Sequence, residues 1–207
     1  MNIRHPLTRL LAAASIAASV TTAGSALAAG PQIHLRGEIT SVSASQIVVK
    51  ARNGSTTTVQ LPEKLQVLDV SATTLSAVAE NSYIGVAAAP AGAGKIRALG
   101  LMVFPEGARG LNEGHFPWDL QDKSTMTNAT VSKLLHKGDG AQIEVRWGDK
   151  TQSVLVDQKT VISQFVPGAR TLLVNGARVF VFASQAEGGP PSASAIMVGR
   201  DGFLPTL

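Results

Sequence analysis

The chain contains no cysteine among its 207 residues. This absence excludes a disulfide framework, thiol catalysis and covalently attached c-type haem. Aromatic residues make up only 4% of the sequence and charged residues only 15%. The basic residues form no Lys/Arg cluster of the kind that tracks a nucleic-acid backbone. We therefore expect a fold held together by apolar packing, with no nucleic acid as a partner.

Long apolar runs are also missing. The run near the N-terminus, residues 10–20, is rich in Ala, Ser and Thr, so it is too short and too weakly hydrophobic to span a bilayer. Basic residues precede this run and Ala26-Leu27-Ala28 follows it, which is the pattern of a cleaved secretory signal. The sequence thus predicts a signal peptide over residues 1–28, cleavage near Ala28, a periplasmic or secreted location and no membrane span after cleavage.

Export also changes the charge of the protein. Cleavage removes Arg4 and Arg9, so the formal net charge falls from +4 to +2. A nearly neutral exported protein has neither the charge nor the compartment of a nucleic-acid-binding protein.

The remaining sequence contains an internal similarity. The segment Gln46-Ile47-Val48-Val49-Lys50 reappears as Gln142-Ile143-Glu144-Val145-Arg146, and residues 83–87 resemble residues 179–183 at the same offset. Further matches keep the same order and nearly the same spacing. We therefore predict a duplicated supersecondary unit.

Each unit has the pattern of β-strands. Apolar residues alternate with polar ones, as in a strand with one buried face, and Asn53-Gly54 and Gly148-Asp149 are typical of two-residue hairpin turns. The connections over 63–80 and 157–170 are each expected to hold a short extended piece and one helical turn. The predicted strands lie near 33–42, 46–52, 55–61, 83–89 and 95–104 in the first unit, and near 128–135, 141–147, 150–156, 178–184 and 192–199 in the second.

This pattern predicts an all-β fold of two tandem five-stranded OB-like small barrels joined by a Gly/Pro-rich linker. The first barrel is assigned to residues 29–104, the linker to 105–126 and the second barrel to 127–207. A β-sandwich is the structural alternative, because periodicity alone does not distinguish the two.

The linker differs from the rest of the chain. Residues 105–120 are dense in Gly and Pro, which predicts a loop instead of a strand or helix. However, Phe104, Phe116 and Trp118 lie in it or beside it, whereas flexible linkers lack aromatic residues.

A resemblance supports this division. The linker pattern Glu-Gly-x-Arg-Gly-x-x-Glu-Gly-His-x-Pro-Trp-Asp-Leu, followed by residues 124–129, resembles a secreted proteobacterial family of unknown function, whose repeats are similar to small OB-like β-barrels. The resemblance covers the mature chain. It implies a periplasmic location and tandem barrels, and it implies no activity.

The linker also holds the candidate metal ligands. His115 has Glu113 and Asp119 close in sequence, and these residue types suit zinc or another divalent metal. The alternative is that the two carboxylates cap turns while His115 bonds to the backbone, because the pattern lacks the paired histidines of established sites. His34 and His136 are expected to be exposed polar residues. No cofactor is expected, apart from this divalent metal.

Three further linker residues are candidates for ligand or partner binding. Phe116 and Trp118 would anchor a partner protein or a ring-shaped ligand if exposed, or hold the linker between the barrels if buried. Arg109 is expected to pair with Glu113 or Asp119 and fix the loop.

No catalytic motif accompanies these residues. The segment 91–95 superficially resembles a phosphate-binding loop, but Ala89 and Ile96 stand where that motif requires Gly and Ser or Thr. The leading hypothesis is therefore a non-enzymatic periplasmic binding or accessory protein that contacts an unknown periplasmic protein or small ligand through the linker. A divalent metal-binding protein and a hydrolase without a recognisable nucleophile–base pair are the alternatives.

Overall fold

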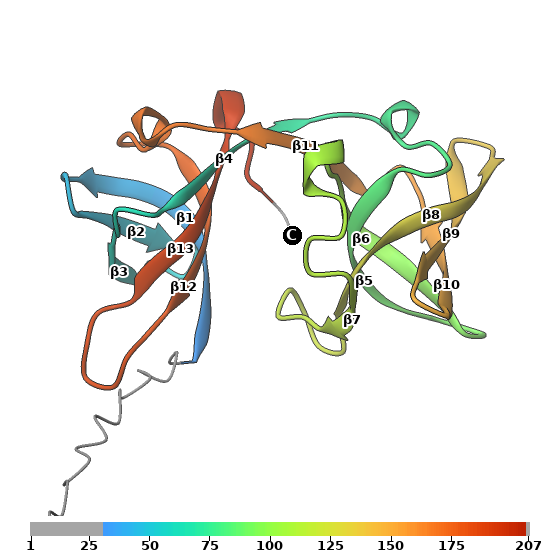
Figure 1. Ribbon diagram of the computed structural model, residues 1–207, viewed down its shortest axis with the longest axis horizontal. Helices are drawn as coiled ribbons and strands as arrows, with labels where there is room; N and C mark the ends of the chain where they lie inside the picture. Colours follow the sequence, from blue (N-terminus) through green and yellow to red (C-terminus); the bar gives the residue numbers. More distant parts are fainter. Residues whose placement is uncertain (1–30, 206–207) are drawn as a thin grey trace, which may run out of the picture.

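The computed structural model describes residues 31–205 and is all-β (Figure 1). The signal peptide predicted over residues 1–28 lies outside the described residues. Among residues 31–205, helices are limited to single 3-10 turns, so none could cross a membrane. The strands are β1 (Gln32–Val42), β2 (Gln46–Ala51), β3 (Thr56–Gln60), β4 (Gln66–Ala72), β5 (Tyr83–Gly92), β6 (Lys95–Val103), β7 (Gly114–Pro117), β8 (Thr125–Lys137), β9 (Gly140–Trp147), β10 (Lys150–Val156), β11 (Val161–Pro167), β12 (Arg178–Ser184) and β13 (Ser192–Gly199). The 3-10 turns are η1 (Leu75–Ala77), η2 (Glu106–Ala108), η3 (Arg170–Leu172) and η4 (Arg200–Gly202).

The ten predicted strands all occur close to their expected bounds. Side-chain alternation explains them: in β9, Ile143 and Val145 are fully buried while Glu144 and Arg146 are exposed. The connection over 63–80 holds an extended piece and a helical turn as predicted, β4 and η1. The connection over 157–170 holds the extended piece β11, but its helical turn, η3, begins only at Arg170 and runs past the predicted bound. One prediction is wrong, because the linker is not loop throughout: residues 114–117 form β7 by pairing with β8.

All strands belong to one connected sheet, whose pairings close two rings. The first ring has the order β13-β12-β1-β2-β3, and the second has the order β6-β5-β8-β9-β10. Parallel pairing of β3 with β13 and of β10 with β6 closes them. Between the rings, β4 and β11 pair antiparallel; β4 also pairs with β13, and β11 with β6. Figure 1 shows the first ring at the left, the second at the right, and β4 and β11 running across the top.

Each ring takes strands from both predicted units. The first ring joins β1–β3 to β12 and β13, and the second joins β5 and β6 to β8–β10. The expectation that residues 29–104 and 127–207 each close a barrel of their own is therefore wrong. The cause is that β4 and β11 run alongside each other and carry the chain to the opposite ring. Because the two units share one hairpin pattern, the sequence does not distinguish pairing within a unit from pairing between units.

The two rings correspond strand by strand. The register of the β1–β2 pair shifts between Ile39 and Ser41, and the register of the β8–β9 pair shifts between Val131 and Lys133. The β5–β6 and β12–β13 pairs also carry matching shifts, after Ala87 and after Phe182. By these shifts, Ile39 corresponds to Val131 and Phe182 to Ala87.

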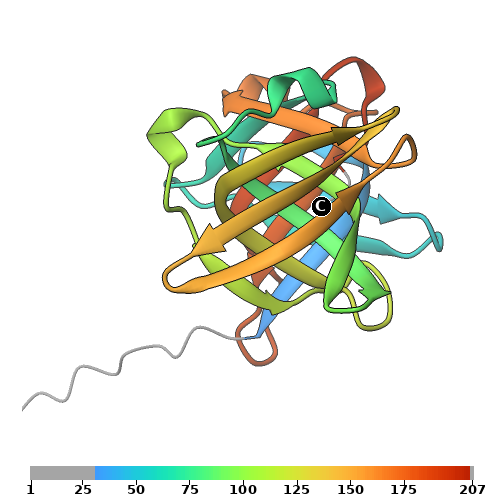
Figure 2. The same cartoon turned by 90° about the vertical axis from the view of Figure 1, so that its right-hand side faces the viewer.

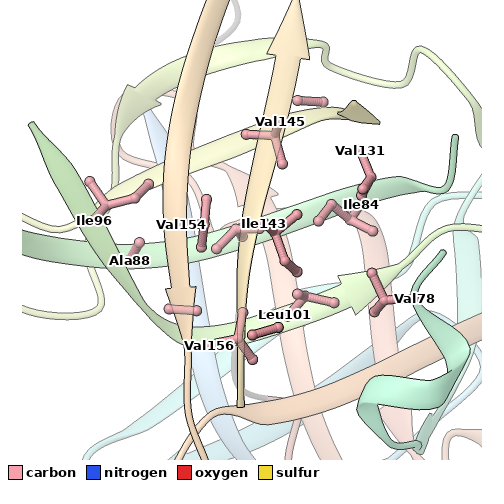
Figure 3. Close-up of a cluster of buried hydrophobic side chains, with 14 of the residues drawn as sticks. Val78, Ile84, Ala88, Ile96, Leu101, Val131, Ile143, Val145, Val154 and Val156 are labelled. Atoms are coloured by element: carbon pink, nitrogen blue, oxygen red, sulfur yellow. The ribbon is translucent and has the colours of Figure 1, made fainter. Parts of the chain in front are cut away.

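Buried side chains form three clusters. One fills the second ring and draws on β5, β6 and β8–β10, as the side chains in Figure 3 show. Figure 2 looks onto this ring, with the yellow-to-orange strands β8–β10 crossing the green strands β5 and β6. The second cluster fills the first ring. The third, called here the central cluster, lies between the rings; its buried members are Leu68, Val70, Ala87, Met102, Met126, Phe165, Phe180 and Met197.

Candidate functional site

The linker is organised by β7, which lies against β8. Gly114–Pro117 pair antiparallel with residues 125–128 of β8, and the Asn128 side-chain amide donates hydrogen bonds to the carbonyls of Leu111 and Asn112, 3.4 and 3.2 Å away. Since side chains alternate along a strand, β7 has an inner face toward the central cluster and an outer face.

The inner face carries the predicted aromatic pair. Phe116 and Trp118 both pack against the central cluster, and their ring centroids are 6.0 Å apart. The Trp118 ring lies 4.6 Å from the His34 ring and 6.2 Å from that of Phe180. Both aromatic residues therefore hold the linker between the rings, which is the buried alternative of the sequence analysis.

Next to Trp118, an ion pair ties the linker to β1. The Asp119 carboxylate accepts hydrogen bonds from Arg36, the shorter being 2.8 Å, and lies 3.0 Å from Nδ1 of His34. Burial raises the pKa of Asp119, but the hydrogen bonds and charges of Arg36 and His34 outweigh burial and hold it below its usual value. The Arg36 guanidinium also lies 4.1 Å from the centre of the Phe180 ring, a distance typical of a cation–π contact.

The outer face of β7 carries His115. Its Nδ1 lies 2.8 Å from Oγ1 of Thr127, and its ring stacks on Trp147 with 5.6 Å between centroids and 17° between planes. Burial, and secondarily the charge of Lys150, lower the pKa of His115. The neutral imidazole is therefore favoured in the folded protein.

Two residues that precede β7, Glu113 and Leu111, make further contacts. The Glu113 carboxylate accepts a hydrogen bond from the Gly148 N–H, 3.1 Å away, in the β9–β10 turn. Leu111 is 44% exposed, and its carbonyl accepts a hydrogen bond from the Tyr83 hydroxyl at 3.1 Å. Burial, followed by the charge of Glu113, raises the pKa of Tyr83 to about 12, so this hydroxyl stays a donor.

Arg109 does not make the predicted contact with Glu113 or Asp119. Its guanidinium donates to both carboxylate oxygens of Glu106, at 2.5 and 2.7 Å, and to the Asn81 carbonyl at 2.8 Å. The one-turn helix η2 causes this difference, because it places Glu106 three residues before Arg109 on the same side. Arg109 thus fixes the start of the linker through Glu106 and Asn81.

The structure does not bring the three proposed metal ligands together. Asp119 bonds to β1, Glu113 bonds to the β9–β10 turn, and His115 bonds to β8. In the part of the chain that the structure describes, no group of three or more His, Cys, Asp or Glu residues could hold a metal ion.

Three residues that contact the linker, His34, Arg36 and Trp147, were not predicted from the sequence as part of the site. His34, expected to be an exposed polar residue, has a side chain only 19% exposed and lies within 5.3–5.5 Å of the rings of Phe180 and Phe182. Arg36 and Trp147 complete the contacts to the linker. A signal was present, because His34-x-Arg36 and Phe180-x-Phe182 each place two large side chains on one face of a strand, but only the pairing of β1 with β12 joins them.

Comparison of the chain with known protein families, curated proteins and solved structures gives no match. The resemblance to a secreted proteobacterial family therefore stays a prediction.

Proposed function

We propose that the chain is a non-enzymatic binding or accessory protein of the periplasm that contacts its partner through the outer face of β7. The observation that carries this proposal is that side chains on the two faces of β7 have different surroundings. Phe116 and Trp118 are occupied between the rings, whereas His115 stacks on Trp147 at the surface. We therefore propose His115, and not the aromatic pair, as the residue that contacts the partner.

The surface around His115 suits a protein partner. Leu111 supplies an exposed apolar side chain, and Glu113 and Lys150 supply charges of both signs beside the aromatic stack. Aromatic residues surrounded by polar groups are typical of interface centres. Hydrogen bonds to Thr127, Gly148 and Asn128 hold this surface in place.

We extend the proposal to the fold and its origin. Five strands in each ring, a longer connection after the third strand of each unit and matching register shifts favour two small OB-like barrels that arose by internal duplication. The strand exchange between units makes the pair a single cooperative body instead of two independent domains. The secretory pattern of residues 1–28 supports export.

A comparison of two histidine variants tests the partner contact. His115→Glu introduces a charge onto the outer face of β7, whereas His136→Glu introduces the same charge at the far, exposed end of β8. Capture of a defined partner from periplasmic extract should fall at least tenfold with His115→Glu and remain unchanged with His136→Glu. Equal capture by both variants would remove the outer face of β7 from the proposal.

A further inference from the structure

Equivalent strands of the two rings have different neighbours. β8 pairs with β5 along one edge; along the other edge it pairs with β9 through residues 130–137 and with β7 through residues 125–128. β1 pairs with β12 through residues 32–38 and with β2 through residues 37–42. Within residues 31–205, no strand pairs with Gln32–Leu35 on the edge opposite β12. The first ring thus has an open edge where the second ring holds β7.

The backbone of β1 presents hydrogen-bonding groups along this edge. The Gln185 N–H donates to the Pro31 carbonyl at 3.3 Å, and the Ile39 N–H donates to the Ala177 carbonyl at 2.9 Å. Bonds to one neighbour involve every second residue of an antiparallel strand, so odd-numbered residues of β1 bond to β12. The N–H and C=O groups of Gln32 and His34 consequently point toward the open edge.

β8 uses the same alternation to hold β7. The Trp118 N–H donates to the Ser124 carbonyl at 2.8 Å, so even-numbered residues of β8 face β7. The matching register shifts after Ile39 and Val131 make His34 equivalent to Met126. The groups that bind β7 in the second ring therefore have counterparts on β1.

Side-chain burial distinguishes the two edges in the same way. Leu35 corresponds to Thr127, which is fully buried beneath His115. Leu35 and its neighbour Ile33 remain partly exposed, although both pack against the core of the first ring. Beside the edge, the rings of His34 and Phe182 lie 5.3 Å apart, and the Trp118 ring of the linker packs against both, at 4.6 and 6.4 Å between centroids.

We infer that the edge of β1 at Gln32–Leu35 binds an extended segment of a partner protein, which adds antiparallel to β1 as β7 adds to β8. Strand addition supplies main-chain hydrogen bonds, and alternate side chains supply specificity. The segment that fits resembles β7: it is four or five residues long, with an aromatic residue that packs beside His34, Phe182 and Trp118 and extends their aromatic cluster. This inference does not require the outer face of β7 to bind anything.

The test uses the whole chain and a peptide that copies residues 112–120. A fluorescently labelled peptide is titrated with wild type, with Gln32→Pro and with the matched control Gln32→Ala. Proline removes the outward N–H of residue 32 but is tolerated at the first residue of a strand. We expect saturable binding to wild type and to Gln32→Ala, and at least tenfold weaker binding to Gln32→Pro. A peptide with Ala in place of Phe116 and Trp118 should also bind at least tenfold more weakly.

A measurement on wild type alone keeps the inference testable if Gln32→Pro fails to fold. Hydrogen exchange of the His34 amide should slow at least tenfold when the peptide is bound. Absence of saturable binding, unchanged exchange at His34, or equal affinity of folded Gln32→Pro and Gln32→Ala would each overturn the inference. The last result would place the peptide elsewhere, for example on β8 in place of β7.

Discussion

The two rings have the same strand pairings, yet they meet with different surfaces. On the first ring, β12 presents Phe180 and Phe182 to the space between the rings. The equivalent positions on β5 are Gly85 and Ala87, because the register shifts after Ala87 and Phe182 correspond. A Cβ at Gly85 would lie 3.2 Å from the Phe104 ring, so an aromatic residue at the start of the linker occupies the space that Phe180 fills in the other ring.

This comparison shows how equal backbones acquire different roles. The first ring contributes aromatic side chains of its own strand β12 to the contact. The second ring has small residues at the equivalent positions of β5, and the aromatic residues on its side come from the linker around β7. The result is an asymmetric contact in which the first ring retains an open strand edge and the second ring does not.

The largest effect is expected at Phe180. It is fully buried and its ring contacts those of Phe182 and Trp118. Phe180→Ala should lower the free energy of unfolding by about 3–5 kcal/mol, measured by urea denaturation. Phe182→Ala, at a half-buried position, should cost clearly less. Equal losses for the two variants would mean that Phe180 does not hold the contact between the rings.

The second prediction concerns Gly85 of β5, the position equivalent to Phe180, where a substitution should lower the free energy of unfolding by a smaller amount. A Cβ at Gly85 would lie 2.8 Å from Oδ1 of Asn128, the side chain that holds the linker. Gly85→Ala should therefore cost about 1–3 kcal/mol of unfolding free energy through overpacking.

Gly107→Ala is the matched control, because an added Cβ there meets nothing within 4 Å. A neutral Gly85→Ala would show that β5 and β12 tolerate the same side chains, which would contradict the asymmetry.

A pH dependence should mark the ion pair between β1 and the linker. The pKa of Asp119 lies below 3.8 in the folded protein, so its contribution to stability is present above that value and is lost as the pH falls through the folded-state pKa. Because the carboxylate is 47% exposed, the contribution should be at most about 1 kcal/mol. The stability difference between wild type and Asp119→Asn, measured by denaturation from pH 2 to about pH 6, should shrink toward acid; a constant difference would exclude the ion pair.

The smallest effect concerns His115, on the strand that only the second ring carries. Its pKa should lie below 6.5 in an NMR titration, because burial and Lys150 disfavour the protonated ring. The stability linked to this group is present above 6.5 and is lost as the pH falls through the lowered pKa. Lys150→Gln should raise the pKa of His115 slightly. A pKa at or above 6.5 in wild type would show that the imidazole is not buried against the second ring of strands, and so that β7 does not lie there as described.

The sequence was sufficient for the strands but not for their partners. Alternation in segments such as residues 142–147 marks a buried face wherever the strand pairs, so strand bounds follow from local pattern. The exchange of strands between units depends on β4 and β11. Their local pattern, QVLDVSA and VISQFVP, predicts a strand but does not say which ring the next strand joins. Similarly, Gly and Pro in the linker indicated a loop, whereas pairing with β8 makes Gly114–Pro117 a strand.

The candidate site was predicted only in its linker half. Glu113, His115 and Asp119 are close in sequence, but β-strand alternation and the turn after β7 send them to different neighbours. His34 and Phe180 lie far apart in sequence and meet through the β1–β12 pairing. Long-range pairing of this kind leaves no local signal, and tertiary contact decides it.

The exchange of strands between the two units is the central claim, and a crosslink tests it directly because the chain has no cysteine of its own. Gln32 of β1 lies opposite Ser184 of β12 in a pair that does not share hydrogen bonds, where Cα atoms are close enough for a disulfide. The variant Gln32→Cys/Ser184→Cys is oxidised and then cut at a protease site inserted after Gly107. The account predicts that the two fragments remain one band on a non-reducing gel, and that Gln32→Cys/Ala89→Cys, which pairs β1 with the equivalent position of β5, forms no disulfide. Crosslinking of Gln32→Cys/Ala89→Cys instead would show that each unit closes on itself and would contradict the account.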